Sequence, residues 1–279
     1  MKTSNQLKAL ICNLAKEKSV QAEVILRNYM LERLLERIAL SEYRNTFILK
    51  GGMLVAAMVG IDARSTMDMD ATMKGVAFSE ESLEKAFSDI LAVPVDDSVN
   101  MSIKGFEPIR DEAEYPGIRV SIEAVLDKTK QTIKIDVTSG DIITPKEVEY
   151  PFKLLLEDRT ISIMAYNLET VLAEKLETIL SRGTANSRMR DYYDVFVLTT
   201  LRDPDINWSL FASAFKGTAT KRDTYNPLLK SGHENLNAIE SSELLPALWA
   251  RYQGKYAYAF DLSWKQVLAG VRALFYKAF

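Results

Sequence analysis

The chain has 279 residues, 47% apolar and 26% charged, which are ordinary values for a globular protein of one or two domains. Its net charge of −3 provides no overall basic field that would attract nucleic acid, and only a local basic patch could do so. Cys12 is the only cysteine, which excludes an intrachain disulfide, and the longest uncharged apolar run, Met53 to Ile61, is too short to span a bilayer. We therefore expect a soluble, cytoplasmic protein with no membrane partner.

The first part of the chain has helical patterning. Apolar residues recur at helical spacing from Leu7 to Leu14, and a second, broader apolar stripe runs from Val24 to Ile38. The short apolar run 47–49 ends at a glycine pair and predicts a strand followed by a sharp turn. Residues 53–59 then suit a short helix that begins at the glycines.

The middle of the chain is predicted to be rich in strands, and the last part is predicted to be helical. Residues 67–73 alternate apolar and polar side chains, which is typical of a strand. Ser79 is placed to cap a helix that runs to about residue 91. Further strands are expected at 99–106, 118–126 and 131–138, with a turn at Tyr115-Pro116-Gly117, and helices are expected at 167–180, at 187–201 and at the C-terminus.

These elements predict an α+β protein with a mixed sheet. We expect N-terminal helices over residues 1–44 to pack on an α/β core over residues 45–165. A helical C-terminal domain is expected over residues 166–279. The sequence contains no internal repeat and no low-complexity linker.

Asp68 and Asp70 are the first candidates for chemistry. Both lie on the predicted strand 67–73, where residues two apart point to the same side, and their carboxylates repel unless a cation offsets the repulsion. Mg²⁺ suits such a pair together with phosphate oxygens. The alternative is a pair of solvated strand residues, because a second D-x-D, Asp203-Pro204-Asp205, occurs in a predicted loop where no chemistry is expected.

Asp136 is a candidate third carboxylate. It lies in the alternating run Ile133-Lys134-Ile135-Asp136-Val137, on the face opposite the apolar residues. Three carboxylates from two strands could hold two metal ions, one at an attacking hydroxyl and one at a leaving pyrophosphate. An ordinary outward-facing strand residue is the alternative.

Gly51 and Gly52 are candidates for binding an anion. At the N-terminus of a helix their N–H groups would be exposed to a phosphate, and Lys50 and Arg64 are near enough in sequence to assist. Equally, the glycines could merely permit a tight corner, and the two cations could be surface charges. The chain has no Walker A motif, and its single histidine, His233, excludes a multi-histidine metal site.

Several of these segments together resemble one protein family. The segments Leu49-Lys50-Gly51-Gly52 and Arg64-Ser65-Thr66-Met67-Asp68-Met69-Asp70 look like the opening motif of the AbiEii family, and the resemblance extends to the segments around Asp136, Lys175 and Asp191. Members of that family are nucleotidyltransferase-like toxins of abortive-infection and toxin–antitoxin systems, similar to the mycobacterial MenT toxins and more distantly to DNA polymerase β. The resemblance implies a nucleotidyltransferase-like fold.

The resemblance also implies functions for particular residues. Lys175 matches a lysine that contacts nucleotide phosphates, and Asp191 matches an acidic residue needed for activity. From the residues alone, a salt bridge between Lys175 and Asp191 is the structural alternative. Arg182, Arg188 and Arg190 form the local basic cluster that could meet RNA phosphates.

The leading hypothesis is therefore a nucleotidyltransferase toxin that uses Mg²⁺ or Mn²⁺. It would move a nucleotidyl group from an NTP to RNA, with the 3′ end of tRNA as the leading acceptor and a protein as the alternative. This would block translation and growth in phage defence, and a cognate antitoxin would be encoded nearby. Two other hypotheses are a binding module that holds an NTP without turnover and a phosphotransferase that acts on a protein.

Overall fold

The computed structural model describes residues 4–109 and 117–279 and divides the chain into two compact units. The first unit contains Met1–Gly140 and Val148–Ala165, and the second contains Asp141–Glu147 and Tyr166–Phe279. The chain therefore passes into the second unit for a short segment, returns to the first, and then enters the second again.

The first unit is built on a seven-stranded sheet in the order β3-β4-β5-β2-β1-β7-β6. The pairs β1–β7 and β2–β5 are parallel and the other pairs are antiparallel, so the sheet is mixed, as predicted. The strands are β1 (Phe47–Lys50), β2 (Met69–Met73), β3 (Val99–Ile109), β4 (Gly117–Leu126), β5 (Thr129–Ser139), β6 (Val148–Lys153) and β7 (Thr160–Ala165). The helical elements are α1 (Ser4–Glu17), α2 (Ala22–Leu40), the short 3-10 helix η1 (Glu42–Asn45), α3 (Gly51–Val59) and α4 (Glu80–Ala92).

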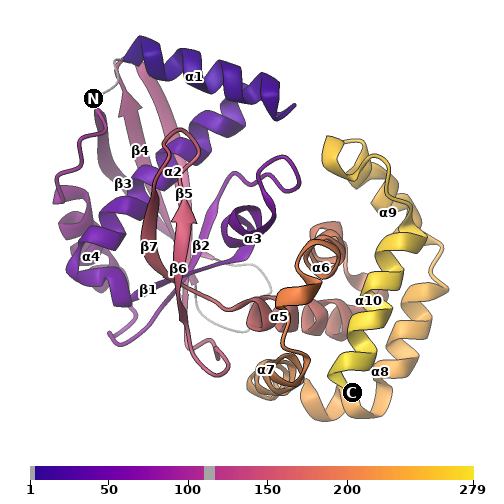
Figure 1. The fold of residues 1–279 in the computed structure, drawn as a ribbon. Helices are drawn as coiled ribbons and strands as arrows, with labels where there is room; N and C mark the ends of the chain where they lie inside the picture. Colours follow the sequence, from indigo (N-terminus) through magenta and orange to yellow (C-terminus); the bar gives the residue numbers. More distant parts are fainter. Residues whose placement is uncertain (1–3, 110–116) are drawn as a thin grey trace. The chain divides into compact units, whose positions relative to one another are not determined.

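Alternating side chains divide the central strands into an apolar face and a polar face. On β5, Ile133, Ile135 and Val137 are fully buried, whereas Asp136 between them is half-buried. Helix α2 crosses one face of the sheet and packs against β5 and β7, with α1 beside it (Figure 1). The first unit therefore has an apolar core on one side of these strands and leaves a polar row on the other.

Most predicted elements of the first unit are confirmed. The N-terminal helices are present, and β1 ends at Lys50, directly before the glycine pair that begins α3. Ser79 caps α4, and its hydroxyl accepts a hydrogen bond from the Ser82 N–H at 3.1 Å. Two residues of the predicted turn at 115–117 lie outside the described residues.

The predicted strand over residues 67–73 is wrong at its start. Strand β2 begins at Met69, so Asp68 precedes the strand and only Asp70 lies on it. Its neighbour β1 ends at Lys50, which pairs with Asp70, because the chain turns into α3 at Gly51. No residue of β1 is therefore left to pair with Asp68.

The hairpin of β6 and β7 was not predicted from the sequence. Its buried residues Phe152, Ile161 and Ile163 alternate with exposed ones, which is the signal that identified the other strands. Strand β7 pairs in parallel with β1 and so completes the sheet next to the strand that leads into α3.

The second unit is helical. Helix α5 contacts α6, α7, α8 and α10, and Asn167 caps it by accepting a hydrogen bond from the Thr170 N–H at 2.8 Å. The predicted helix cap and the predicted helical C-terminal part are confirmed. The elements are α5 (Leu168–Arg182), η2 (Gly183–Ala185), α6 (Met189–Leu201), η3 (Asp203–Asp205), α7 (Trp208–Lys221), α8 (Tyr225–Glu240), α9 (Leu244–Gln253), η4 (Ala257–Ala259) and α10 (Trp264–Ala278).

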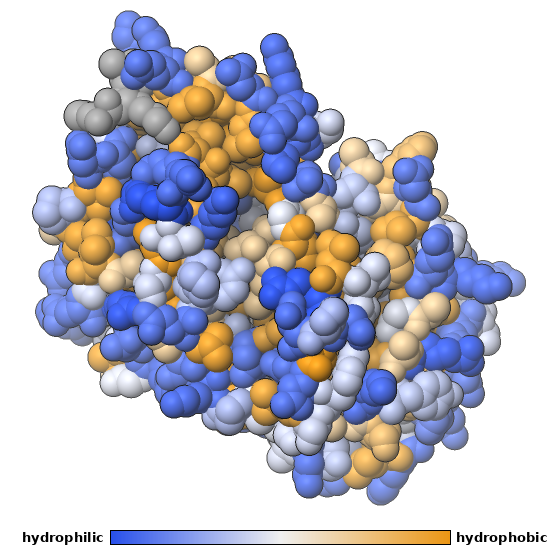
Figure 2. All heavy atoms as spheres, viewed as in Figure 1, coloured by the Kyte–Doolittle hydropathy of each residue, from blue (hydrophilic) through white to orange (hydrophobic). Residues whose placement is uncertain are grey.

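Hydrophilic residues cover much of the visible surface of both units, and hydrophobic residues are exposed among these hydrophilic ones (Figure 2). In residues 4–109 and 117–279, every helix is too short or too polar to cross a membrane.

Helix α2 carries a buried carboxyl group whose ionisation is linked to stability. Glu32 is 2% exposed, and the Leu155 N–H donates to both of its oxygens at 3.1 and 3.2 Å. Burial raises the pKa of Glu32 to about 8, while the Leu155 N–H and the Arg33 guanidinium oppose this rise. Folding therefore favours the protonated form of Glu32.

We expect Glu32→Gln to remove a pH-dependent loss of stability. The folded-state pKa is above the ordinary value near 4.5, so stability from neutral Glu32 is present below that value and is lost as pH rises toward 8. The slope of the free energy of unfolding approaches about 1.4 kcal/mol per pH unit for one proton. Urea unfolding of both proteins at several pH values should show Glu32→Gln gaining stability relative to the wild type as pH rises. Glu23→Gln, at an exposed residue of the same helix, is the control, and a constant difference for Glu32→Gln would contradict the assignment.

Candidate functional site

Five charged residues form a row across five neighbouring strands of the first unit. Lys50 on β1 pairs in register with Asp70 on β2, and Asp70 pairs with Asp136 on β5. Asp136 pairs with Arg119 on β4, and Arg119 pairs with Glu107 on β3. Because residues paired in register point to the same face of a sheet, these five side chains share one face. We call them the charged row.

Asp70 lies against the N-terminus of α3. Its Oδ2 accepts a hydrogen bond from the Gly52 N–H at 3.3 Å. Gly51 has φ +65°, and a Cβ atom there would lie 2.1 Å from Oδ2 of Asp70. Glycine is therefore required at position 51 for two reasons. Its backbone is left-handed, and the Asp70 carboxylate occupies the space that a Cβ atom would need.

Gly52 is just as closely surrounded. A Cβ atom at this position would lie 2.9 Å from Oγ1 of Thr66 and 3.2 Å from a terminal nitrogen of Arg64. Arg64 is 1% exposed and also donates to the Ser65 carbonyl, so it is a buried residue and not a surface charge. The structure thus brings the two glycines, Arg64 and Asp70 together at the start of α3. The helix N-terminus supplies N–H groups and a partial positive charge, which favour an anion.

Lys50 extends along the same row. Its Nζ donates to Oγ1 of Thr138 on β5 at 2.8 Å. The ammonium group therefore reaches over β2, which carries Asp70 and lies between β1 and β5. This position places one positive charge beside the paired carboxylates.

Arg119, like Glu107, belongs to the row but was not predicted from the sequence. Its Nε donates to Oδ1 of Asp136 at 2.7 Å, and its Nη2 donates to Oδ2 at 2.8 Å. The hydrogen bond to Asp136 is the largest effect that raises the pKa of Arg119, and the charges of Asp68 and Glu107 also raise it, whereas burial lowers it. Asp68 therefore acts on the same guanidinium, although it lies outside β2.

A signal for Arg119 was present in the sequence. Leu126 pairs with Thr129 across the two-residue turn Asp127-Lys128, so β4 and β5 form a hairpin. Counting pairs back from that turn places Arg119 opposite Asp136.

The paired carboxylates have the right chemistry for a magnesium ion that also binds phosphate. Mg²⁺ commonly uses one or two carboxylates, substrate phosphates and water, and Asp70 and Asp136 lie at the same register of adjacent strands. For residues 4–109 and 117–279, no group of three His, Cys, Asp or Glu side chains is arranged to hold a metal ion. A magnesium ion at this site would therefore be held by the carboxylates of Asp70 and Asp136 together with the substrate, and not by a preformed group of three carboxylates that includes Asp68.

Lys175 and Asp191, the two remaining predicted residues, lie in the second unit and pair with each other. Nζ of Lys175 on α5 lies 2.7 Å from Oδ1 of Asp191 and 3.0 Å from Oδ2 of Asp194, both on α6. Both aspartates are buried. This is the salt bridge that the sequence left open as an alternative, with Asp194 as a further partner.

One carboxylate oxygen of Asp191 has no hydrogen-bond donor among the described residues. Within the described chain, Oδ2 of Asp191 is buried and accepts no hydrogen bond, although Nε of Arg188 lies 3.6 Å away. Of the predicted basic cluster, Arg188 therefore turns toward Asp191, and its side chain remains 60% exposed.

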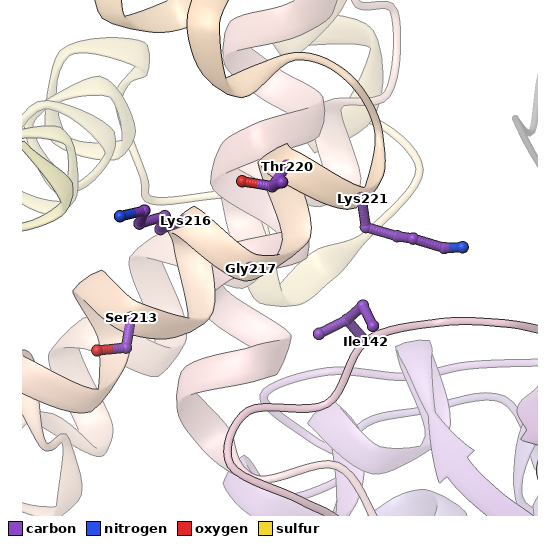
Figure 3. A pocket seen from close by; sticks show the side chains of 6 residues that line it. All are labelled: Ile142, Ser213, Lys216, Gly217, Thr220 and Lys221. Atoms are coloured by element: carbon purple, nitrogen blue, oxygen red, sulfur yellow. The ribbon is translucent and has the colours of Figure 1, made fainter.

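An open surface pocket of about 510 Å³ lies in the second unit. Its lining comes mainly from α7 and consists of Ile142, Ser213, Lys216, Gly217, Thr220 and Lys221. In Figure 3 the side chains of Lys216 and Lys221 point in opposite directions, so their charges do not converge on one ligand position. We assign this pocket no part in the chemistry.

Comparison with known proteins identifies a family. The family model described as nucleotidyl transferase AbiEii toxin, type IV TA system, matches residues 33–270. No curated protein is significantly similar to the chain.

Three of the solved structures with some similarity come from Helicobacter pylori and Paracoccidioides brasiliensis. A candidate nucleotidyltransferase from Helicobacter pylori is 14% identical, with 93% of this chain and 97% of that chain covered and a TM-score of 0.49. The JHP933 protein of Helicobacter pylori is 13% identical, with coverages of 92% and 94% and a TM-score of 0.49. An antigenic nucleotidyltransferase-like protein from Paracoccidioides brasiliensis is 14% identical, with coverages of 72% and 92% and a TM-score of 0.38.

Proposed function

The chain belongs to the AbiEii family of nucleotidyltransferase toxins of type IV toxin–antitoxin systems, and from this premise we propose that it transfers a nucleotidyl group from an NTP to RNA with the help of Mg²⁺ or Mn²⁺. The 3′ end of tRNA is the acceptor that we propose, and the result would be a block of translation in the cytoplasm during phage defence. A cognate antitoxin follows from the family.

One observation supports this proposal above the others. Asp70 and Asp136 are paired in register on β2 and β5, and Asp70 contacts the N-terminus of α3 through the Gly52 N–H. A triphosphate needs both a site for its negative charge and carboxylates that hold its metal, and the first unit offers the two side by side. A module that only bound nucleotide would have less need for the adjacent carboxylates.

The chemistry assigns a task to each residue of this site. The N–H groups at Gly51 and Gly52 would bind phosphate oxygens, with Lys50 and Arg64 adding positive charge. Asp70 and Asp136 would hold the metal, whose charge neutralises the triphosphate and the departing pyrophosphate. Lys175 and Asp191 remain predictions from the family resemblance.

The transfer itself is a displacement at the α-phosphorus. The acceptor hydroxyl oxygen forms a bond to that phosphorus, the bond between the α-phosphorus and the bridging oxygen breaks, and pyrophosphate leaves with the bonding electrons. Asp136 would take the hydroxyl proton, either directly or through water. The product is an RNA extended by one nucleotide and free pyrophosphate.

The test follows the label from each end of the NTP. The full chain is incubated with Mg²⁺ and total RNA, or with a cell protein extract, and with each NTP labelled at the α- or γ-phosphate. We expect α-label in RNA of tRNA size and no γ-label, because the γ-phosphate leaves in pyrophosphate. The α-label should be lost in EDTA and with Asp70→Asn, and label that persists in both would come from a contaminant.

The other outcomes separate the competing functions. γ-Label on a protein would identify a phosphotransferase, and α-label on a protein would replace the RNA acceptor. NTP binding without label on any acceptor would favour the binding module and overturn the proposal.

A further inference from the structure

Arg119 is bound to the carboxylate that the proposed function needs for a metal. The guanidinium donates to both oxygens of Asp136, and the Arg119 side chain is one-third exposed while that of Asp136 is 19% exposed. Two parallel hydrogen bonds of this kind hold the planar guanidinium and carboxylate groups edge to edge. In the structure Asp136 is therefore already satisfied by a positive charge.

Apart from Glu107 at its outer end, the charges of the row balance without a metal ion. Lys50 and Arg119 contribute two positive charges, and Asp70 and Asp136, which lie between them, contribute two negative charges. A divalent cation would add two positive charges to this balanced group. A carboxylate oxygen has lone pairs for both partners, but a guanidinium and a metal ion on the same carboxylate repel each other.

We propose that Arg119 is a resident counter-cation that competes with the metal ion for Asp136 and moves to the triphosphate when metal and nucleotide are bound. This inference rests on the proposed function. A triphosphate supplies the anionic oxygens that arginine binds in a two-point manner, so the released guanidinium gains a new partner. The site would thus bind metal poorly by itself and bind metal and nucleotide well together.

The proposal predicts effects of opposite sign for Arg119→Gln. With Mn²⁺ alone, measured by the electron paramagnetic resonance of free Mn²⁺, the full-length variant should bind the ion about five-fold more tightly than the wild type, because one charge-assisted pair no longer competes. At saturating Mn²⁺, the variant should bind a non-hydrolysable NTP analogue about five-fold less tightly, because the arginine that would hold the phosphate is gone. Arg119→Lys keeps the charge but not the two-point hydrogen bond, so both of its affinities should lie between those of the wild type and those of Arg119→Gln.

Arg44→Gln is the matched control. Arg44 also forms an arginine–carboxylate pair in the first unit, with Glu149, but it lies outside the charged row, so neither affinity should change. Thermal unfolding of each variant confirms that the proteins compared are folded.

Each outcome decides between distinct conclusions. Weaker binding of both ligands by Arg119→Gln would show that Arg119 only holds Asp136 in place. Unchanged binding of both ligands would show that Arg119 neither competes with the metal ion nor binds the triphosphate. Both results overturn the inference, while the proposed function stands. If the wild type and Arg119→Gln both fail to bind Mn²⁺ and the analogue, the proposed function fails and the inference fails with it.

Discussion

Gly51→Ala is expected to lower nucleotidyl transfer by at least about 100-fold, because a displacement of about 1 Å in a reacting group costs this much. The added methyl group would lie 2.1 Å from Oδ2 of Asp70, so the carboxylate or the start of α3 must move. The measurement is incorporation of α-labelled NTP into RNA by wild type and variant at equal concentrations of folded protein.

Gly75→Ala provides the matched control for this prediction. Gly75 has φ +81°, close to the φ of +65° at Gly51, but among the described residues no heavy atom beyond its chain neighbours lies within 4 Å of its added Cβ. Both variants carry the backbone strain of a left-handed alanine, about 1–3 kcal/mol, and only Gly51→Ala meets the carboxylate. Equal losses of activity in both variants would attribute the effect to strain, and full activity of Gly51→Ala would show that Asp70 does not need its observed position.

Lys175→Met is expected to lower the free energy of unfolding by about 3–5 kcal/mol. The substitution leaves Asp191 and Asp194 buried on α6 without the ammonium group that lies 2.7 and 3.0 Å from them. Urea unfolding followed by circular dichroism measures the loss. The transfer activity of Lys175 variants must therefore be measured on protein that is shown to be folded.

The prediction for Lys175 has an internal rescue. Adding Asp194→Asn to Lys175→Met removes one of the two buried negative charges that have lost the ammonium group and should recover part of the lost stability. Lys230→Met, at an exposed residue of α8, should stay within about 0.5 kcal/mol of the wild type. A wild-type midpoint for Lys175→Met would show that the buried aspartates do not depend on this lysine, and it would favour a role for Lys175 at the nucleotide phosphates instead.

The elements that could be predicted from the sequence are those that local residues determine. Ser79 and Asn167 cap the helices that follow them through backbone N–H groups three residues ahead, and the strand at 47–50 ends where a glycine pair begins a helix. Such signals lie within a few residues of the element they define. The hairpin of β6 and β7 carries an equally local alternation, so these two strands could also be predicted from the sequence.

The arrangement of the candidate site depended on pairings that no local pattern specifies. The parallel pairing of β2 with β5 joins Asp70 to Asp136, and the end of β1 at Lys50 leaves Asp68 outside the strand. The sequence predicted the residue types but not this order of strands. The β4–β5 hairpin, by contrast, has a register that can be counted from its two-residue turn, and that register leads to Arg119.

The route of the chain between its two units limits how the protein can be divided. Segment 141–147 belongs to the second unit, where the Thr144 carbonyl accepts a hydrogen bond from the Asn167 side chain at 2.7 Å and the Thr144 N–H donates to Oγ1 of Thr170 at 3.2 Å. A fragment that ends at Ala165 would keep this segment but lose both partners, and a fragment that begins at Tyr166 would lose the segment itself. A single cut in the chain therefore cannot separate the two units completely. To produce each unit as its own polypeptide, segment 141–147 would have to be removed from the first unit, and the β6–β7 hairpin would have to be joined directly to the end of β5.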